Sequence, residues 1–170
     1  MKKIWLAGGC FWGVEAYFRQ IKGVLKTQVG YGQGTTTEPT YQQVCSGVTG
    51  HAEVCEVSYD AKVLPLTKVL EHLFRIIDPT MLNQQGADRG TQYRTGIYYS
   101  AEADKSIIAD FMKQMGEKYV DALVVEVEPV TNFYLAEEYH QAYLQKNPGG
   151  YCHVNLQAVK PDERQVGESV

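Results

Sequence analysis

The apolar residues of this chain recur with two periods, one typical of strands and one typical of helices. Segments with the short runs or the two-residue alternation of strands are residues 2–7, 24–31, 52–60, 95–99 and 123–128. Segments with the three-to-four-residue spacing of amphipathic helices are residues 11–20, 66–77, 101–117 and 135–145. This mixture predicts an α+β fold: a mixed, largely antiparallel sheet covered by helices, a two-layer sandwich with a ferredoxin-like core.

Two long polar stretches interrupt the pattern. Residues 30–39 are rich in glycine, threonine and proline, and residues 80–94 are rich in glycine, asparagine, glutamine and aspartate. Long loops in a compact domain usually carry function. The 170 residues suit one core, so we expect a single domain over residues 1–159 and an irregular polar tail or linker over residues 160–170.

Composition narrows the classes of function. The chain has 16 Lys and Arg against 20 Asp and Glu, a net charge of −4, and so lacks the basic excess that neutralises nucleic-acid phosphates. No apolar run approaches the roughly 20 residues of a membrane helix. The run after Lys2 and Lys3 is too short for an export signal. We therefore expect a cytoplasmic protein, a monomer that binds neither nucleic acid nor membrane.

The cysteines are scattered, with no C-x-x-C pair, at Cys10, Cys45, Cys55 and Cys152. A chain of this length builds a core without disulfides, so catalysis, metal binding and core filling are the alternatives for these residues. The histidines are His51, His72, His140 and His153. None of them has metal-ligand spacing, and we expect no metal site.

Cys10 has the strongest chemical signature. It lies where the first predicted strand turns, through Gly8 and Gly9, into the first predicted helix. The amides and dipole at a helix start favour a thiolate, which is the nucleophilic form of cysteine, and the glycines leave the sulfur accessible. Phe11 and Trp12 beside it indicate a small apolar pocket that would suit a methyl group.

The pentapeptide Gly9-Cys10-Phe11-Trp12-Gly13 resembles the signature of the methionine sulfoxide reductase A family. Further segments resemble that family in the same order: Gly30-Tyr31-Gly32-Gln33-Gly34, Tyr41-Gln42-Gln43-Val44-Cys45-Ser46-Gly47, Gly50-His51-Ala52-Glu53-Val54, Asp78-Pro79-Thr80, Gln85-Gly86-Ala87-Asp88-Arg89-Gly90-Thr91-Gln92-Tyr93-Arg94 and Asn147-Pro148-Gly149-Gly150-Tyr151-Cys152. An ordered set of segments over most of the chain is far more specific than one pentapeptide.

The resemblance implies reduction of methionine S-sulfoxide, free or in proteins, to methionine. Cys10 is then the nucleophile and ends as a sulfenic acid. Cys152 is the resolving cysteine that converts this sulfenic acid into a disulfide. The resemblance also implies thioredoxin as the external dithiol that reduces the disulfide, with no bound cofactor.

Other residues of the matching segments would contact the substrate. They are Phe11 and Trp12 at the methyl group, Tyr41, Glu53 and Tyr93 at the sulfoxide oxygen, and Asp88 at the backbone amide. Elementary chemistry agrees for Glu53, which shares a predicted strand face with Cys55, Val57 and Tyr59. Burial raises the pKa of a carboxyl group, so Glu53 could stay protonated and give a proton to the departing oxygen.

Two other functions stay open for Cys10. A cysteine hydrolase or acyltransferase would need His51 or His140 within hydrogen-bond distance, would form an acyl-enzyme and would tolerate loss of Cys152. A binding module that holds methionine or a methylated group would keep its activity without Cys10. In the reductase reading, with Cys152 as the resolving cysteine, Cys45 and Cys55 are expected to be structural.

Overall fold

The structure, a computed structural model, describes residues 1–165; the last part of the predicted tail, residues 166–170, lies outside the described residues. One six-stranded sheet forms its centre, in the order β7-β6-β1-β3-β2-β8. These strands are β1 (Lys2–Gly8), β2 (Val24–Gly32), β3 (Ala52–Tyr59), β6 (Thr95–Tyr99), β7 (Glu126–Pro129) and β8 (Phe133–Leu135). All neighbours pair antiparallel except β6 and β7. The predicted α+β class with a largely antiparallel sheet is confirmed.

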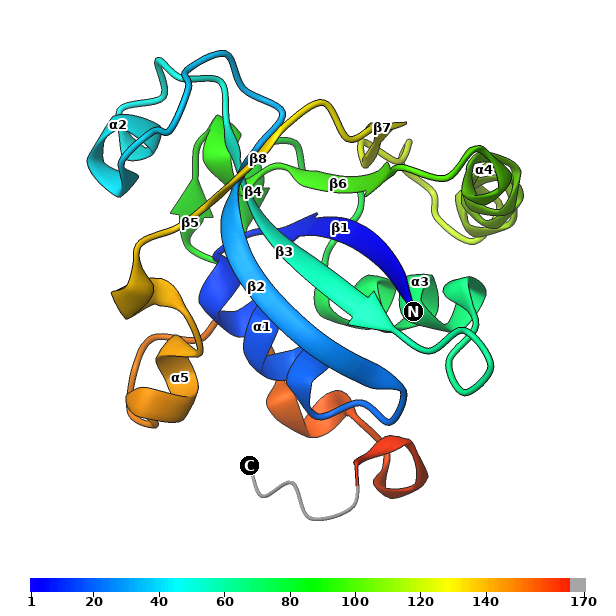
Figure 1. The fold of residues 1–170 in the computed structure, drawn as a ribbon. Helices are drawn as coiled ribbons and strands as arrows, with labels where there is room; N and C mark the ends of the chain where they lie inside the picture. The colour runs from blue at the N-terminus through cyan, green and yellow to red at the C-terminus, as the bar shows by residue number, and fades with distance from the viewer. Residues whose placement is uncertain (166–170) are drawn as a thin grey trace.

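Helices and one short hairpin surround the sheet (Figure 1). The helices are α1 (Phe11–Arg19), α2 (Tyr41–Cys45), α3 (Leu66–Ile76), α4 (Glu102–Gly116) and α5 (Tyr143–Lys146). Within the predicted loop 80–94, β4 (Gln84–Gln85) pairs with β5 (Asp88–Arg89). Figure 1 shows α1 lying along β2 and β3, with α5 beside it and α4 at the far edge of the sheet. Among residues 1–165, no helix is long and apolar enough to cross a membrane.

Alternate residues of β3 pack into two different hydrophobic clusters, one on each face of the sheet. Cys55, Val57 and Tyr59 belong to the large cluster that packs under α1 and α3. Val54 belongs to a small cluster on the opposite face. By its position in the alternation, Glu53 faces the large core, and it lies there beneath the first turn of α1, whose Phe11 backbone N–H donates to it. The sheet pleat thus brings a carboxyl group under the helix start that follows Cys10.

The helix predicted over residues 135–145 is wrong. The segment contains the end of β8, a 3₁₀ turn (Glu138–His140) and only the start of α5. Hydrogen bonds between this segment and the rest of the domain replace those of a helix. The Gln141 amide pairs with both the N–H and the C=O of Val29, at 2.9 and 2.8 Å, as a further strand residue would. Glu15 accepts a hydrogen bond from the Ala142 N–H at 2.7 Å, and Ala142 is left-handed with φ 51°. These tertiary contacts override the apolar spacing.

The domain boundary expected after residue 159 stays a prediction. Up to residue 165 the chain lies against α1 and α3. Glu163 forms two hydrogen bonds with the Arg75 guanidinium, at 2.6 and 2.8 Å, which lower the pKa of this carboxyl to about 2. The Gln165 N–H donates to the Gln20 carbonyl at 2.9 Å.

Candidate active site

Cys10 lies between β1 and α1, and the prediction that it marks a strand-to-helix turn is confirmed. Gly9 has φ +86°, and a Cβ there would lie 2.7 Å from Cβ of Gln85, so the turn requires glycine twice over. The backbone N–H groups of Trp12 and Gly13 lie close enough to the sulfur to lower the pKa of the thiol, although no cap hydrogen bond to the side chain forms. The side chain is 8% exposed. The free amides of the first helical turn therefore point at a nearly buried sulfur.

Burial and the helix start have opposite effects on the pKa of Cys10. Desolvation raises the pKa of the Cys10 thiol well above its ordinary value, and the negative charge of Glu53 raises it further. The amides of Trp12 and Gly13 lower it, but less. The expectation that a helix start alone favours the thiolate is therefore incomplete, because the ionisation of Cys10 depends on whether Glu53 carries a proton.

Glu53 is 1% exposed and has a partner at each carboxyl oxygen. The Phe11 N–H donates to Oε1 at 3.1 Å, and Nε2 of Gln92 donates to Oε2 at 3.3 Å. Burial raises the pKa of Glu53 to about 7, although both hydrogen bonds lower it. Near neutral pH this carboxyl exists as both acid and carboxylate, which suits a group that exchanges a proton.

Phe11 and Trp12 lie in an aromatic cluster beside Cys10. The Phe11 ring is 5.7 Å from Tyr31 and 5.2 Å from His140. Trp12 stacks on Tyr143 at 3.7 Å with an angle of 7°, and its Nε1 donates to Nδ1 of His140 at 3.0 Å. The indole is therefore held on its face and at its edge, and the resulting wall is rigid.

Tyr41 and Tyr93 come from α2 and from a 3₁₀ turn (Thr91–Tyr93), two segments far apart in the sequence. Burial raises the pKa of both hydroxyls. A hydrogen bond with Cys45 raises it further for Tyr41, and the charge on Glu53 raises it for both tyrosines. Both hydroxyls stay protonated at neutral pH and lie within electrostatic reach of Glu53. The structure thus brings Tyr41, Tyr93 and Glu53 together.

Sequence reasoning did not single out Gln92. Its side chain is 5% exposed and its Nε2 lies 3.3 Å from both Oε2 of Glu53 and Sγ of Cys45. The residue falls inside a segment of the family resemblance, next to Tyr93, but no local pattern distinguishes it from other loop glutamines. Cys45 is exposed as a residue and contacts this network from the outer side.

Asp88 and Cys152 lie in two segments that contact each other through Tyr151. Asp88 is on β5, where its Oδ2 accepts a hydrogen bond from the Tyr151 hydroxyl at 2.9 Å. Sγ of Cys152 lies 3.3 Å from where a Cβ on Gly13 would stand, and it donates to the Val154 carbonyl at 3.3 Å. Cys10 and Cys152 are both free thiols. Cys152 therefore lies against the turn of α1 that begins at Cys10.

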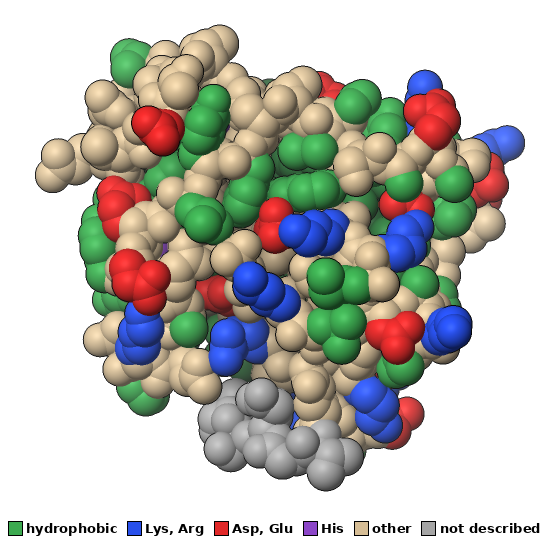
Figure 2. All heavy atoms as spheres, in the orientation of Figure 1, with side chains coloured by type: hydrophobic (Ala, Val, Ile, Leu, Met, Phe, Trp, Pro, Cys, Tyr) green, Lys and Arg blue, Asp and Glu red, His purple; other side chains and the backbone are tan. Residues whose placement is uncertain are grey.

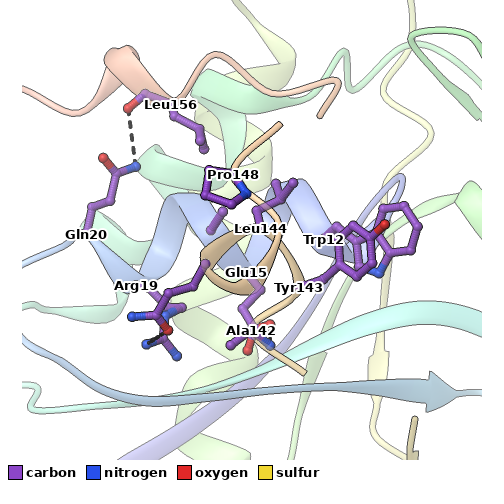
Figure 3. A pocket seen from close by; sticks show the side chains of 11 residues that line it. Trp12, Glu15, Arg19, Gln20, Ala142, Tyr143, Leu144, Pro148 and Leu156 are labelled. Carbon is purple, nitrogen blue, oxygen red and sulfur yellow. Dashed lines mark hydrogen bonds between the residues drawn. The ribbon is translucent and has the colours of Figure 1, made fainter. Parts of the chain in front are cut away.

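Two hollows of the structure lie outside this cluster. One, of about 310 Å³, separates α1 from α5 and has the stacked Trp12 and Tyr143 at one end (Figure 3). The other, of about 540 Å³, lies between α3 and α4. Neither is lined by Cys10. Within residues 1–165, no group of three or more His, Cys, Asp or Glu side chains could hold a metal ion.

The histidines that a cysteine hydrolase would need have other partners, at both ring nitrogens of His51 and at Nδ1 of His140. Nδ1 of His51 accepts from the Gly34 N–H at 3.1 Å, and its Nε2 lies 2.6 Å from the Thr36 carbonyl. Nδ1 of His140 accepts from Trp12. In the described part of the chain neither ring forms a hydrogen bond with Cys10, so no base is in place to activate this cysteine in the manner of a cysteine hydrolase.

Comparison with known proteins agrees with this geometry. The family model described as peptide methionine sulfoxide reductase matches residues 2–168. The peptide methionine sulfoxide reductase MsrA of Clostridium botulinum (strain Loch Maree / Type A3) is 56% identical over 156 residues, which cover 92% of this chain and 99% of that protein.

Two solved structures share the fold. Mxr1 from Saccharomyces cerevisiae in reduced form superposes with a TM-score of 0.86 at 41% identity, covering 91% of each chain. Mxr1 in complex with Trx2 superposes with a TM-score of 0.60 at 29% identity, covering 84% of each chain. With the match over nearly its whole length, the chain belongs to the peptide methionine sulfoxide reductase A family.

Proposed function

We propose that Cys10 and Glu53 carry out the reduction of methionine S-sulfoxide to methionine for which this family of oxidoreductases is named. One observation carries the proposal: both groups meet at the first turn of α1. The amides of Trp12 and Gly13 lower the pKa of the Cys10 thiol, while the Phe11 N–H donates a hydrogen bond to the Glu53 carboxyl. A nucleophile and a proton donor are thus fixed on the same rigid element.

In the first step, the oxygen atom passes from the substrate sulfur to the Cys10 sulfur. The Cys10 thiolate takes the oxygen, the sulfur–oxygen bond of the substrate breaks, and Glu53 supplies a proton to the oxygen. Methionine leaves, and Cys10 remains as a sulfenic acid. Tyr41 and Tyr93, which stay protonated because burial raises their pKa values, donate to the sulfoxide oxygen while negative charge develops on it.

The remaining contacts are apolar at the methyl group of the substrate and polar at its backbone amide. Phe11 and the edge of the fixed Trp12 ring receive the methyl group. Asp88 binds the backbone amide of the substrate. That amide then replaces the Tyr151 hydroxyl, which donates a hydrogen bond to the Asp88 carboxylate in the free protein.

Cys152 resolves the sulfenic acid, and thioredoxin reduces the Cys10–Cys152 disulfide. Two thiols and one external dithiol supply all the electrons of a cycle, so no bound cofactor is needed. Support for the thioredoxin step comes from the complex of Mxr1 with Trx2, since that protein shares the fold of this chain.

A setting and an architecture are part of the same proposal. A cytoplasmic monomer without nucleic-acid or membrane partners agrees with the net charge of −4 and with the intermingled acidic and basic side chains of the face in Figure 2. A ferredoxin-like core is supported by the antiparallel order β6-β1-β3-β2, with α1 and α3 as connections. Residues 1–159 act as one catalytic domain, and residues 160–170 form its tail.

The proposed activity is tested with the two sulfoxide epimers. Purified protein with dithiothreitol is expected to release methionine from the S epimer and none above background from the R epimer. The family match is the reason for this expectation, because the two epimers belong to separate enzymes. Methionine is measured by amino-acid analysis over time. Equal release from both epimers, or formation of an acyl-enzyme with ester substrates, would contradict the assignment.

Gln92→Leu is expected to move the pH dependence of the reaction upward. Its amide stabilises the charged form of Glu53, so its loss raises the pKa of Glu53 above about 7, by about one unit for a hydrogen bond to a charged group. The pH at which kcat/KM reaches half its maximum should rise equally. Gln84→Leu, in the same loop with its amide on the Gly86 carbonyl, is the matched control and should leave the profile unchanged.

A further inference from the structure

The segment that carries Cys152 is attached to the site on both sides of this cysteine. On one side, the Tyr151 hydroxyl donates to Asp88 on β5. On the other, Nε2 of His153 lies 2.9 Å from the carbonyl of Gly8, the last residue of β1. Gly8 is two residues before Cys10. The second attachment therefore joins the residue that follows Cys152 to a residue close to Cys10.

The His153 ring is fixed in a defined orientation. A carbonyl oxygen can only accept a hydrogen bond, so Nε2 carries the proton and donates to Gly8, and Nδ1 carries the lone pair. Nε2 also lies 2.9 Å from where a Cβ on Gly9 would stand. The ring therefore occupies the space that the glycine turn leaves open. Desolvation lowers the pKa of His153, which keeps the ring neutral near pH 7.

The same ring contacts the helix turn against which Cys152 rests. A Cβ on Gly13 would stand 3.3 Å from Nδ1 of His153 and 3.3 Å from Sγ of Cys152. Nδ1 is buried and has no hydrogen-bond partner among the described residues, so packing and the Gly8 bond alone hold this ring. Without the Gly8 bond, Cys152 would lose its nearer attachment to the site.

We propose that His153 is a positioning residue for the second step of the reaction: its hydrogen bond to Gly8 holds Cys152 at the start of α1, ready to meet the oxidised Cys10. The proposal rests on the proposed function, in which Cys10 is oxidised and Cys152 resolves it. In that step the Cys152 sulfur bonds to the Cys10 sulfur, the sulfur–oxygen bond of the sulfenic acid breaks, and the oxygen leaves as water with the thiol proton.

A disulfide accepts only a narrow geometry, with sulfurs about 2.0 Å apart and Cα atoms about 4.4–6.8 Å apart. A cysteine on a free segment reaches this geometry rarely, whereas one held beside its partner reaches it often. Loss of the His153 bond should therefore slow disulfide formation and leave the first oxygen transfer unchanged, because His153 touches neither Glu53 nor the aromatic wall in the contacts described above.

The test separates the two steps in one experiment without reductant. Wild type, His153→Leu and His153→Gln are each mixed with methionine S-sulfoxide, and samples are quenched over time. Methionine release reports the first step, and the loss of two free thiols reports the disulfide. His153→Leu keeps the volume but not the donor, whereas the amide of His153→Gln can place a donor near the position of Nε2. Gln157→Leu, an exposed change on the same segment, is the matched control.

We expect His153→Leu to release its first methionine at a rate within about twofold of wild type and to form the disulfide at least about tenfold more slowly, the loss expected for one hydrogen bond. His153→Gln should recover most of the disulfide rate, and Gln157→Leu all of it. Disulfide formation at the wild-type rate in His153→Leu would overturn the proposal, as would an equal loss in both steps with a lowered thermal midpoint.

Failure of the proposed function has a different signature. If wild type itself released no methionine, Cys10 would not be the nucleophile of this reaction. If Cys152→Ser still lost two thiols, another cysteine would be the resolver. Either result is read from variants in which His153 is intact, so it is distinguishable from failure of the positioning role.

Discussion

Cys10→Ser is expected to release no measurable methionine from methionine S-sulfoxide, at least about 1,000-fold less than wild type in a single turnover. A serine oxygen at this position would face the same amides of Trp12 and Gly13, and the fold should be unaffected. It cannot, however, take an oxygen atom and become the equivalent of a sulfenic acid. The loss is therefore chemical and should appear equally with dithiothreitol and with thioredoxin.

Cys55→Ala is the matched control for Cys10→Ser. Cys55 is completely buried on the same face of β3 as Glu53, so its replacement also removes a core thiol close to the site. This variant should unfold more easily, because deletion of a buried side chain leaves a cavity, and yet keep methionine release within about threefold of wild type. Release by Cys10→Ser at a rate like that of the control would remove Cys10 from the mechanism.

Much of the fold was predictable because local patterns and tertiary packing agree. The two-residue alternation in residues 52–60 matches a strand whose two faces pack into different clusters. Gly8-Gly9 before Cys10 indicates a turn that no other residue type makes as easily. The segment 135–145 failed for the opposite reason. The Gln141 side chain bonds to the backbone of Val29, and Glu15 accepts from the Ala142 N–H. Neither contact is visible in the spacing of the segment's own apolar residues.

Some features of the candidate site could likewise be predicted from the local sequence, and others could not. The helix start at Cys10 is a local property, so its amides could be predicted. Its burial and the proximity of Glu53 arise only when β3 passes beneath α1, and these reverse the direction of the expected pKa shift. Gln92 and His153 could not be singled out at all, because each acquires its contact from a segment at least 39 residues away.

The raised pKa values of Cys10 and Glu53 determine how the reaction depends on pH. The pKa of Glu53 is about 7 and that of Cys10 is well above its ordinary value, so the main form above pH 7 is a carboxylate with a thiol. The reactive form, an acid with a thiolate, holds the same number of protons. It is therefore a constant fraction of the singly protonated pair at every pH, and the two titrations belong to the pair.

It follows that kcat/KM should rise as pH rises through about 7 and then stay level, although Glu53 acts as an acid. Glu53→Gln should lower the rate about 100- to 10,000-fold, the usual contribution of a general acid. It should also remove the level region. The amide cannot titrate, so the rate follows the thiolate alone, and burial still keeps the pKa of Cys10 high. The expected profile therefore climbs about tenfold per pH unit from pH 6 to 9. A Glu53→Gln enzyme that kept the wild-type profile, whatever its absolute rate, would show that the proton comes from another group, with Tyr41 and Tyr93 the next to be replaced.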